Sequence, residues 1–207
     1  MKSTALLTDT PSSRDTDPVR ESLIVVLPGG GYGPLAPALR FPILACQQIG
    51  NGETIEIAYL ETSEDDPIPT RLQTVTTAVS EQVSAALERS TATDVVVIAK
   101  SLGTRLLAAI ASSLPQDRRI SAVWLTPLFG VDDVCSAAAR SGLRSLMVAG
   151  TADPHHDQNG FDAVRDALGA DALLIPDADH SLEIVGDVFA TLDAMRSLTS
   201  AVLDFAR

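Results

Sequence analysis

Cysteines are scarce in this chain, and long apolar runs are missing from it. The 207 residues contain only Cys46 and Cys135, which lie far apart and match neither a metal-ligand spacing nor a disulfide framework. No run reaches membrane-spanning length, and residues 1–22 lack the apolar core of a signal peptide. These absences predict a cytoplasmic protein with reduced thiols.

Positive charge is also in short supply. Lysine and arginine together number 15, aspartate and glutamate 27, and the formal net charge of -12 is spread over many segments. Such a surface repels the phosphates of nucleic acids and anionic membranes, so we expect neither as a partner. The charge balance identifies no substrate, and the sequence leaves open whether the chain is a monomer or a homodimer.

Strand-like and helix-like segments alternate along the chain, which has the length of one domain. We expect strands at residues 23–27, 54–60, 95–99, 120–126, 145–149 and 172–175. We expect helices at residues 37–49, 71–89, 104–113, 132–140, 162–168 and 182–205. The last of these carries apolar residues at helical spacing: Val185, Val188, Phe189, Leu192, Met195, Leu198, Val202 and Phe205.

This alternation predicts an α/β fold. Strands separated by helices form βαβ units, and these build a mostly parallel, doubly wound sheet between two helical layers. The continuous runs 23–27 and 95–99 are expected to be central strands, buried on both faces. We expect a single domain over residues 23–207 with no cap domain, because the polar loop 62–69 is too short to separate two domains. Residues 1–22 are expected to be a tail or an edge strand.

Polar and glycine-rich segments follow the predicted strands. In a parallel sheet, ligands bind beyond the carboxyl ends of the strands, so these segments are expected to gather at one edge. They are PGGGYGP (28–34), KSLG (100–103), PLFG (127–130), GTADPHHD (150–157) and PDADHSLE (176–183). A serine, an acid and a histidine therefore reach the same edge from three separate strands, in that chain order.

Ser101 lies where a buried strand gives way to a helix. A serine on such a turn has a strained backbone and an exposed hydroxyl, and the close packing requires small residues on either side, which Ala99 and Gly103 supply. The first amide of the helix, Leu102 N–H, is placed to stabilise an oxyanion. A serine also needs a base and a group that orients the base.

The segments AKSLG, GTADP and DHSLE resemble the α/β-hydrolase superfamily, and the resemblance extends over nearly the whole chain. The order Ser, Asp, His is the order that this superfamily uses. The chain is similar to its small capless members, the dienelactone-hydrolase-like proteins and compact carboxylesterases. The resemblance implies that Ser101 is the nucleophile, His180 the general base and Asp153 the acid that orients the histidine.

The resemblance also implies that the loop PGGGYGP supplies a second oxyanion donor, Gly30 N–H first, with Gly31 or Tyr32 as alternatives. The chain departs from the family at Ala99, where glycine is commonest, and at Pro28, where many relatives have histidine. Serine stands at position 101, where dienelactone hydrolases have cysteine, so their substrate is not implied.

Together these features predict a serine hydrolase that acts on small acyl esters or thioesters through an acyl-enzyme on Ser101. No cofactor is expected. Tyr32, Leu128 and Phe129 are expected to line the substrate pocket, whereas Trp124 is expected in the core. Because no segment is long enough for a lid, the site should be open.

Other residues compete for these roles. His155 and His156 could serve as the base, line the site or bind a metal, although no further metal ligands can be placed and no metal site is predicted. Asp157, Asp177 and Asp179 compete with Asp153 and are expected to be solvated. Lys100 either favours acidic substrates or pairs with a carboxylate beneath the turn.

Two alternatives belong to other functional classes. The stretch GYGPLA (31–36) fits a dinucleotide-binding pattern, with Glu53 or Glu56 about twenty residues further on. However, Pro34 and Pro37 conflict with a helix that must start at once. The second alternative is a catalytically idle α/β-hydrolase fold used as a binding module, because a fold does not fix a function.

Overall fold

A computed structural model describes residues 21–50, 52–63, 65–131 and 133–207. Its strands are β1 (Ser22–Leu27), β2 (Glu53–Glu56), β3 (Asp94–Lys100), β4 (Arg119–Leu125), β5 (Arg144–Gly150) and β6 (Asp171–Ile175). They form one six-stranded sheet in the order β2-β1-β3-β4-β5-β6, and every neighbouring pair is parallel. Of the predicted tail or edge strand, residues 1–20 lie outside the described residues and Ser22 begins β1.

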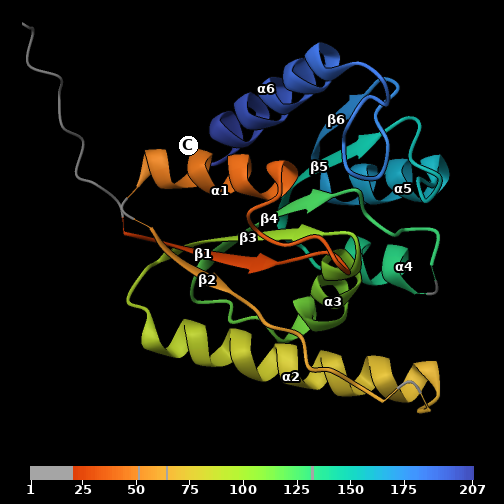
Figure 1. Ribbon diagram of the computed structural model, residues 1–207. Helices are drawn as coiled ribbons and strands as arrows, with labels where there is room; N and C mark the ends of the chain where they lie inside the picture. Colours follow the sequence, from red (N-terminus) through yellow and green to blue (C-terminus); the bar gives the residue numbers. More distant parts are fainter. Residues whose placement is uncertain (1–20, 51, 64, 132) are drawn as a thin grey trace, which may run out of the picture.

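Helices cover both faces of the sheet (Figure 1). They are α1 (Pro37–Ile49), α2 (Ile68–Arg89), α3 (Leu102–Ile110) with the 3₁₀ turn Ala111–Ser113, α4 (Val134–Ala139), α5 (Gln158–Leu168) and α6 (Val188–Phe205). One face of the sheet packs against α1 and α6, and the other packs against α2, α3, α4 and α5. The predicted α/β sandwich without a cap domain is confirmed.

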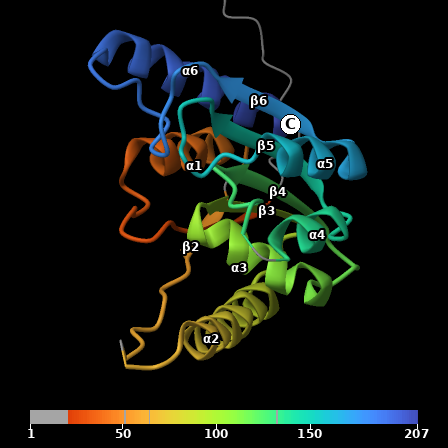
Figure 2. The same ribbon diagram turned by 90° about the vertical axis from the view of Figure 1, so that its right-hand side faces the viewer.

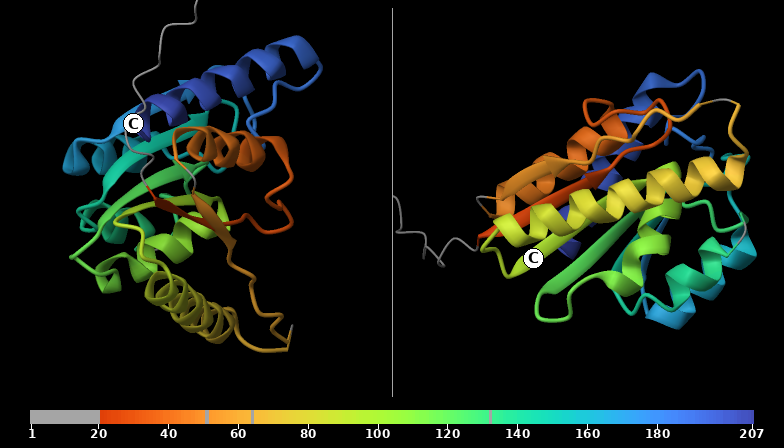
Figure 3. Two further views of the ribbon diagram at one scale, coloured as in Figure 1. Left: turned by 90° about the vertical axis from the view of Figure 1, so that its left-hand side faces the viewer. Right: turned by 90° about the horizontal axis from the view of Figure 1, so that it is seen from below.

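The central strands are buried on both faces, as their continuous apolar sequence predicts. Alternate residues of β3 point to opposite faces, so Val97 packs with α2 and α3 whereas Ile98 packs with α1 and α6. The adjacent β1 shows the same alternation over Leu23–Leu27, where every side chain is fully buried. Figure 3, in its view from below, shows α2 lying along its face of the sheet.

All segments that follow the strands gather at the carboxyl edge of the sheet, which Figure 2 views directly. The chain ends near the opposite edge (Figure 1). Among the elements that the structure describes, no strand-to-helix connection is long enough to form a lid domain; one of the longer connections is residues 176–187. Within the described ranges, no helix combines the length and the apolar character needed to cross a membrane.

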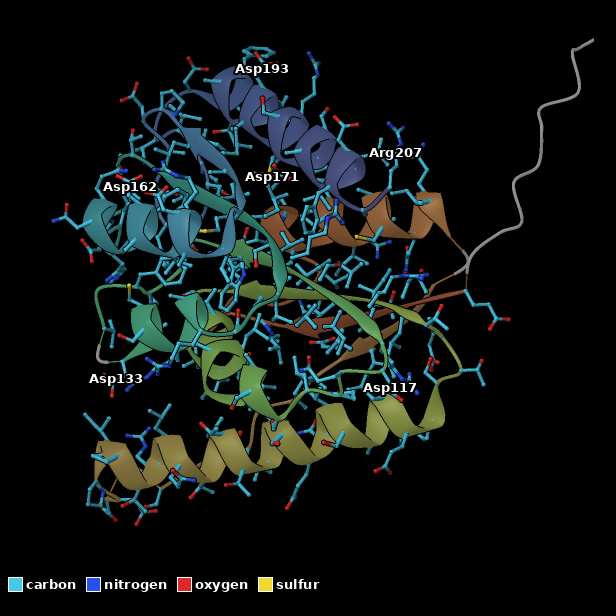
Figure 4. All side chains as sticks on the ribbon, turned by 180° about the vertical axis from the view of Figure 1, so that it is seen from behind. Asp117, Asp133, Asp162, Asp171, Asp193 and Arg207 are labelled. Carbon is cyan, nitrogen blue, oxygen red and sulfur yellow. The ribbon has the colours of Figure 1, made fainter. Side chains whose placement is uncertain are left out.

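Acidic residues are spread over the outer surface. Figure 4 labels several of them, including Asp162 on α5 and Asp193 on α6. Both form local ion pairs along their own helix, Asp162 with Arg165 at 2.6 Å and Asp193 with Arg196 at 3.4 Å. Exposed pairs of this kind contribute at most about 1 kcal/mol, so the negative surface charge is not what holds the fold together.

The last helix begins later than predicted, at Val188 rather than at residue 182. Asp187 caps it, because its side chain accepts hydrogen bonds from the amides of residues 189 and 190. Leu182 and Gly186 have left-handed backbone conformations, φ 62° and 83°, which a helix cannot contain. The first half of the predicted apolar stripe is exposed to solvent: Val185 lies before the helix, and Val188, Phe189 and Leu192 lie within it.

Other boundaries also differ from the prediction. Strand β2 ends at Glu56 instead of residue 60, because the Gln82 side chain binds both backbone groups of Ala58 at 3.2 and 2.8 Å. Helix α5 begins at Gln158 instead of residue 162, and α2 begins at Ile68 instead of residue 71. Helix α4 is shorter than predicted, Val134–Ala139, and the predicted helix 104–113 divides into α3 and a 3₁₀ turn.

The end of β5 touches the backbone of the segment that follows β6. A Cβ atom on Gly150 would lie 2.1 Å from the carbonyl oxygen of Ala178 and 2.6 Å from its carbonyl carbon. Backbone atoms cannot move aside as a flexible side chain can. Only glycine therefore allows these two segments to approach so closely.

We expect Gly150→Ala to lower the free energy of unfolding by about 1–3 kcal/mol, because the new methyl group overlaps the Ala178 carbonyl. Urea unfolding measures this change. Gly33→Ala is the matched control, since a Cβ atom at Gly33 meets nothing within 4 Å and should change stability little. Equal stability of the two variants would contradict the predicted clash.

Candidate active site

The turn between β3 and α3 holds Ser101 in a strained conformation, φ 50° and ψ −113°. Its amide donates to Leu125 O at 3.0 Å, and the Thr104 hydroxyl donates to its carbonyl oxygen at 2.6 Å. A Cβ atom on Gly103 would lie 2.1 Å from Leu27 O, so α3 packs directly on the end of β1. The predicted strained turn is confirmed. The hydrogen bond from Thr104 stabilises this turn, and Thr104 was not among the residues predicted for the site.

Three side chains from different strands meet beside this turn. Ser101 Oγ lies 2.7 Å from His180 Nε2, and His180 Nδ1 lies 2.7 Å from Asp153 Oδ2. A carboxylate only accepts hydrogen bonds, so Nδ1 is the donor in its contact with Asp153, and this tautomer leaves Nε2 to accept from the serine hydroxyl. The contact geometry predicted for these residues is confirmed.

Asp153 is held as a carboxylate. Its side chain is only 2% exposed, and its second oxygen accepts a hydrogen bond from the His155 amide at 2.8 Å. Burial by itself raises the pKa of Asp153, but the hydrogen bonds from His180 and from the His155 amide outweigh burial and lower the pKa below its ordinary value. The acid therefore stays ionised and holds His180 in one orientation.

The competing acids have structural roles. Asp157 caps α5 by accepting from the amides of Asn159 and Gly160, each at 3.2 Å. Asp179 accepts from the amides of residues 181 and 183 at 2.7 and 3.0 Å. Asp157 and Asp179 are half-buried and hydrogen-bonded, whereas Asp177 is exposed as expected.

Neither competing histidine reaches Ser101. His156 Nε2 hydrogen-bonds the Gln158 side chain at 3.0 Å, and its ring packs edge-on against Phe161. The exposed His155 ring packs edge-on against His180, with 4.9 Å between ring centroids. His155 therefore supports the site from its rim. No group of three metal-binding side chains occurs within the described part of the chain.

The glycine loop after β1 lies over the serine. A Cβ atom on Gly29 would lie 3.5 Å from Ser101 Cβ, and Gly29 and Tyr32 exchange two backbone hydrogen bonds of 3.3 Å each. The Tyr32 amide is thus already satisfied. Within the described residues, the amides of Gly30, Gly31 and Leu102 have no hydrogen-bond acceptor. These three amides remain the candidate oxyanion donors.

The predicted pocket residues fall into two groups. Tyr32 and Leu128 are half-buried beside the site, and the Leu128 amide donates to Thr104 Oγ1 at 3.2 Å. Phe129 is only 3% exposed and its ring centroid lies 6.0 Å from that of Trp124, which is fully buried as expected. Phe129 therefore belongs to the core beneath the site and offers almost no surface to a substrate.

The dinucleotide-binding alternative does not fit this loop. Helix α1 begins only at Pro37, after the pattern 31–36 has ended. The Tyr32 hydroxyl accepts a hydrogen bond from the Ala38 amide at 3.1 Å, which occupies a first-turn amide that would have to bind a pyrophosphate. A cavity of about 510 Å³ does exist, but it lies at the opposite edge of the sheet, among residues such as Asp94 and Arg144.

Lys100 fits neither role considered for it. Its side chain is 1% exposed, so it cannot meet an acidic substrate. Its ammonium donates to a hydroxyl and to a backbone carbonyl, Thr126 Oγ1 at 2.9 Å and His180 O at 2.7 Å, and the described residues give it no ion pair. The prediction from sequence missed these contacts because they come from loops far away along the chain.

The lowered pKa of Asp153 yields a prediction about stability and pH. A carboxyl whose pKa is lower in the folded state stabilises the fold fully above its unfolded value, 3.8, and loses that contribution as the pH falls through the folded pKa. We therefore expect Asp153→Asn to destabilise the protein more at pH 5 than at pH 3 in urea unfolding. Asp177→Asn is the control; an equal loss at both pH values for Asp153→Asn would contradict the interpretation.

No protein-family profile and no curated protein sequence matches the chain. Solved structures do match it. The lidless α/β serine hydrolase XC6422 from Xanthomonas campestris superimposes with a TM-score of 0.61 at 17% identity, over 91% of this chain and 84% of that chain.

Two further solved structures also superimpose on this chain. Est1E from Butyrivibrio proteoclasticus, solved with ferulic acid bound, gives a TM-score of 0.69 at 14% identity, over 92% of this chain and 90% of that one. Carboxyl esterase 2 from Tuber melanosporum gives 0.58 at 14% identity, over 89% and 77%. The parallel sheet, the turn at Ser101 and these superpositions agree: the chain has the α/β-hydrolase fold in its capless form.

Proposed function

We propose that this protein is a serine hydrolase that cleaves small acyl esters or thioesters through an acyl-enzyme on Ser101. The observation that carries the proposal is the pair of 2.7 Å contacts that link Ser101, His180 and Asp153. A serine hydroxyl is a weak nucleophile unless a base lies within hydrogen-bond reach and a third group orients that base. This site has both.

The first half of the reaction forms the acyl-enzyme. His180 Nε2 takes the proton of the Ser101 hydroxyl as Oγ attacks the carbonyl carbon of the ester. Asp153 stabilises the imidazolium that results. The carbonyl oxygen becomes an oxyanion, which accepts hydrogen bonds from Leu102 N–H and from Gly30 or Gly31 N–H. His180 then protonates the leaving alcohol or thiol, and its bond to the acyl carbon breaks.

Water completes the cycle. His180 removes a proton from water as the water oxygen attacks the acyl carbon, and the same backbone amides stabilise the second oxyanion. The bond to Ser101 Oγ then breaks, the serine recovers its proton from His180 and the carboxylic acid leaves. The chemistry needs no group beyond the side chains and amides of this chain.

The openness of the site supports small substrates. The His180 side chain is 30% exposed, and the connections around it are short. Two of these connections carry exposed apolar side chains, Leu35 after β1 and Val185 after β6, at the same edge of the sheet as Ser101. Apolar groups at this edge favour a substrate with an apolar acyl group. The structural likeness to a carboxyl esterase and to a protein solved with ferulic acid bound adds support to this class.

Hydrolysis of p-nitrophenyl esters that differ only in acyl length tests the proposal. We expect Ser101-dependent turnover, greatest for short acyl chains, because the short connections form no enclosed channel for a long chain. Absence of turnover across the esters and their thioester counterparts would contradict the proposal and would favour a binding module instead.

Ser101 and His180 should contribute more to kcat than Asp153 does. Ser101→Ala and His180→Ala should each lower kcat by roughly 10⁶-fold, and the double variant should lose no more, because nucleophile and base act as one unit. Asp153→Asn should cost about 10⁴-fold, since it misorients the imidazole. Steady-state kinetics measure these losses. Wild-type turnover in Ser101→Ala would exclude the proposed nucleophile.

The two neighbouring histidines make a matched pair. His155→Ala removes the ring that packs on His180. An aromatic contact of this kind contributes about 0.5–1.5 kcal/mol. If that energy orients His180 for the reaction, its loss corresponds to a roughly twofold to tenfold lower kcat/KM. His156→Ala should leave kcat/KM unchanged, because its ring faces Phe161 and Gln158. A large loss in His156→Ala with none in His155→Ala would show that the roles are reversed.

A further inference from the structure

Lys100 is a buried cation directly before the nucleophile. It is the last residue of β3, its side chain is 1% exposed, and it is among the largest fully buried side chains of the protein. The alternation along β3 directs it to the same face as Ile98, toward the segments that follow β1 and β6.

The Lys100 ammonium joins three segments that are distant in sequence. Nζ donates to Thr126 Oγ1 at the end of β4 and to the main-chain oxygen of His180 after β6. It also lies 4.5 Å from the centroid of the Tyr32 ring in the loop after β1, close enough for a cation–π interaction. The ammonium is therefore fully engaged without any contact to solvent.

Stability alone does not account for a buried ammonium. Burial lowers the pKa of Lys100 to about 8, and the nearby Asp153 and Asp179 carboxylates oppose that shift only in part. Apolar side chains of similar size commonly give a fold that is equally stable or more stable than one with a buried charge. The contacts of the ammonium therefore point to a role in geometry.

The segment around His180 depends on side-chain and backbone contacts for its position, because it belongs to no helix or strand. Asp177 and Leu182 on either side of it have left-handed backbones, φ 58° and 62°. The imidazole is held at Nδ1 by Asp153, whereas its own main chain is held by Lys100. Lys100 is also covalently joined to Ser101, so one residue connects the nucleophile to the backbone of its base.

We propose that Lys100 is a positioning residue that fixes the main chain of His180 and so keeps Nε2 at hydrogen-bond distance from Ser101 Oγ. This inference rests on the proposed hydrolase function. Lys100 touches neither the substrate nor the reacting atoms; it acts through His180. Its removal should therefore lower kcat and leave substrate affinity nearly unchanged.

Lys100→Met tests this inference, because methionine fills a similar volume and donates no hydrogen bond. With p-nitrophenyl butyrate we expect kcat to fall by about 10- to 100-fold, the size of effect that small misplacements of a catalytic group produce, with KM within about twofold of wild type. Thr126→Val is the matched control: it removes the other acceptor of the same ammonium but leaves the link to His180, and should lower kcat by less than about threefold.

A spectroscopic readout separates positioning from loss of folding. The proton that His180 Nδ1 shares with Asp153 gives a downfield proton NMR signal, which should broaden or shift in Lys100→Met and persist in Thr126→Val, with both variants folded by circular dichroism. If Lys100→Met does not fold, Lys100→Leu, whose apolar side chain also donates no hydrogen bond, provides the second test with the same expected result.

Wild-type kcat and an unchanged downfield signal in the Lys100 variant would overturn the inference, and so would an equal loss of kcat in Thr126→Val. Failure of the hydrolase proposal is distinguishable, because the wild-type protein would then show no Ser101-dependent turnover at all. The NMR comparison would in that case still decide whether Lys100 positions His180.

Discussion

Ser101 has a strained backbone conformation, φ 50° and ψ −113°. The packing of α3 directly against the end of β1 stabilises this conformation. Such strain costs about 1–3 kcal/mol and persists where the surrounding packing determines it. Gly103, which has no room for a Cβ atom beside Leu27 O, makes the approach possible, and Thr104 ties the serine carbonyl to α3. The positions of the serine hydroxyl and of the Leu102 amide both follow from this one turn.

A second close approach places His180, the proposed base, opposite that turn. Gly150 at the end of β5 touches the Ala178 backbone, so the strand that precedes Asp153 and the segment that carries His180 lie against each other. Asp153 then binds the imidazole, and Lys100 binds the main chain of the same residue. Within the described residues, the geometry of the site thus arises from packing between the ends of parallel strands.

Much of this arrangement could be predicted from the sequence, because it follows from local patterns. The apolar runs 23–27 and 95–99 predicted buried central strands, and the small residues around Ser101 predicted the strained turn. The serine, the acid and the histidine each follow a strand, and the carboxyl ends of parallel strands share one edge of a sheet, which predicted that the three would meet there. Each of these signals is a local pattern: an apolar run, small residues beside a serine, or a polar residue shortly after a strand.

The rest depends on contacts between distant segments. The helical spacing of apolar residues led to a predicted start of the last helix at residue 182. Periodicity carries no information on backbone angles, so it could not indicate the left-handed conformation of Leu182. Position after a strand suggested that Phe129 faces the pocket, but it does not determine which way a side chain points, and this one points into the core. The partners of Lys100 come from three loops, so no local pattern could have identified them.

The claim that Ser101 is an activated nucleophile is tested most directly by its reaction with a fluorophosphonate. Such reagents form a stable phosphonyl ester with a serine that a neighbouring base activates, and they leave ordinary serines unmodified. Intact-protein mass spectrometry followed by peptide mapping measures the adduct. The account predicts a single adduct on Ser101 that is absent in His180→Ala. Persistent absence of an adduct from the folded wild-type protein, or an adduct on another serine, would contradict it.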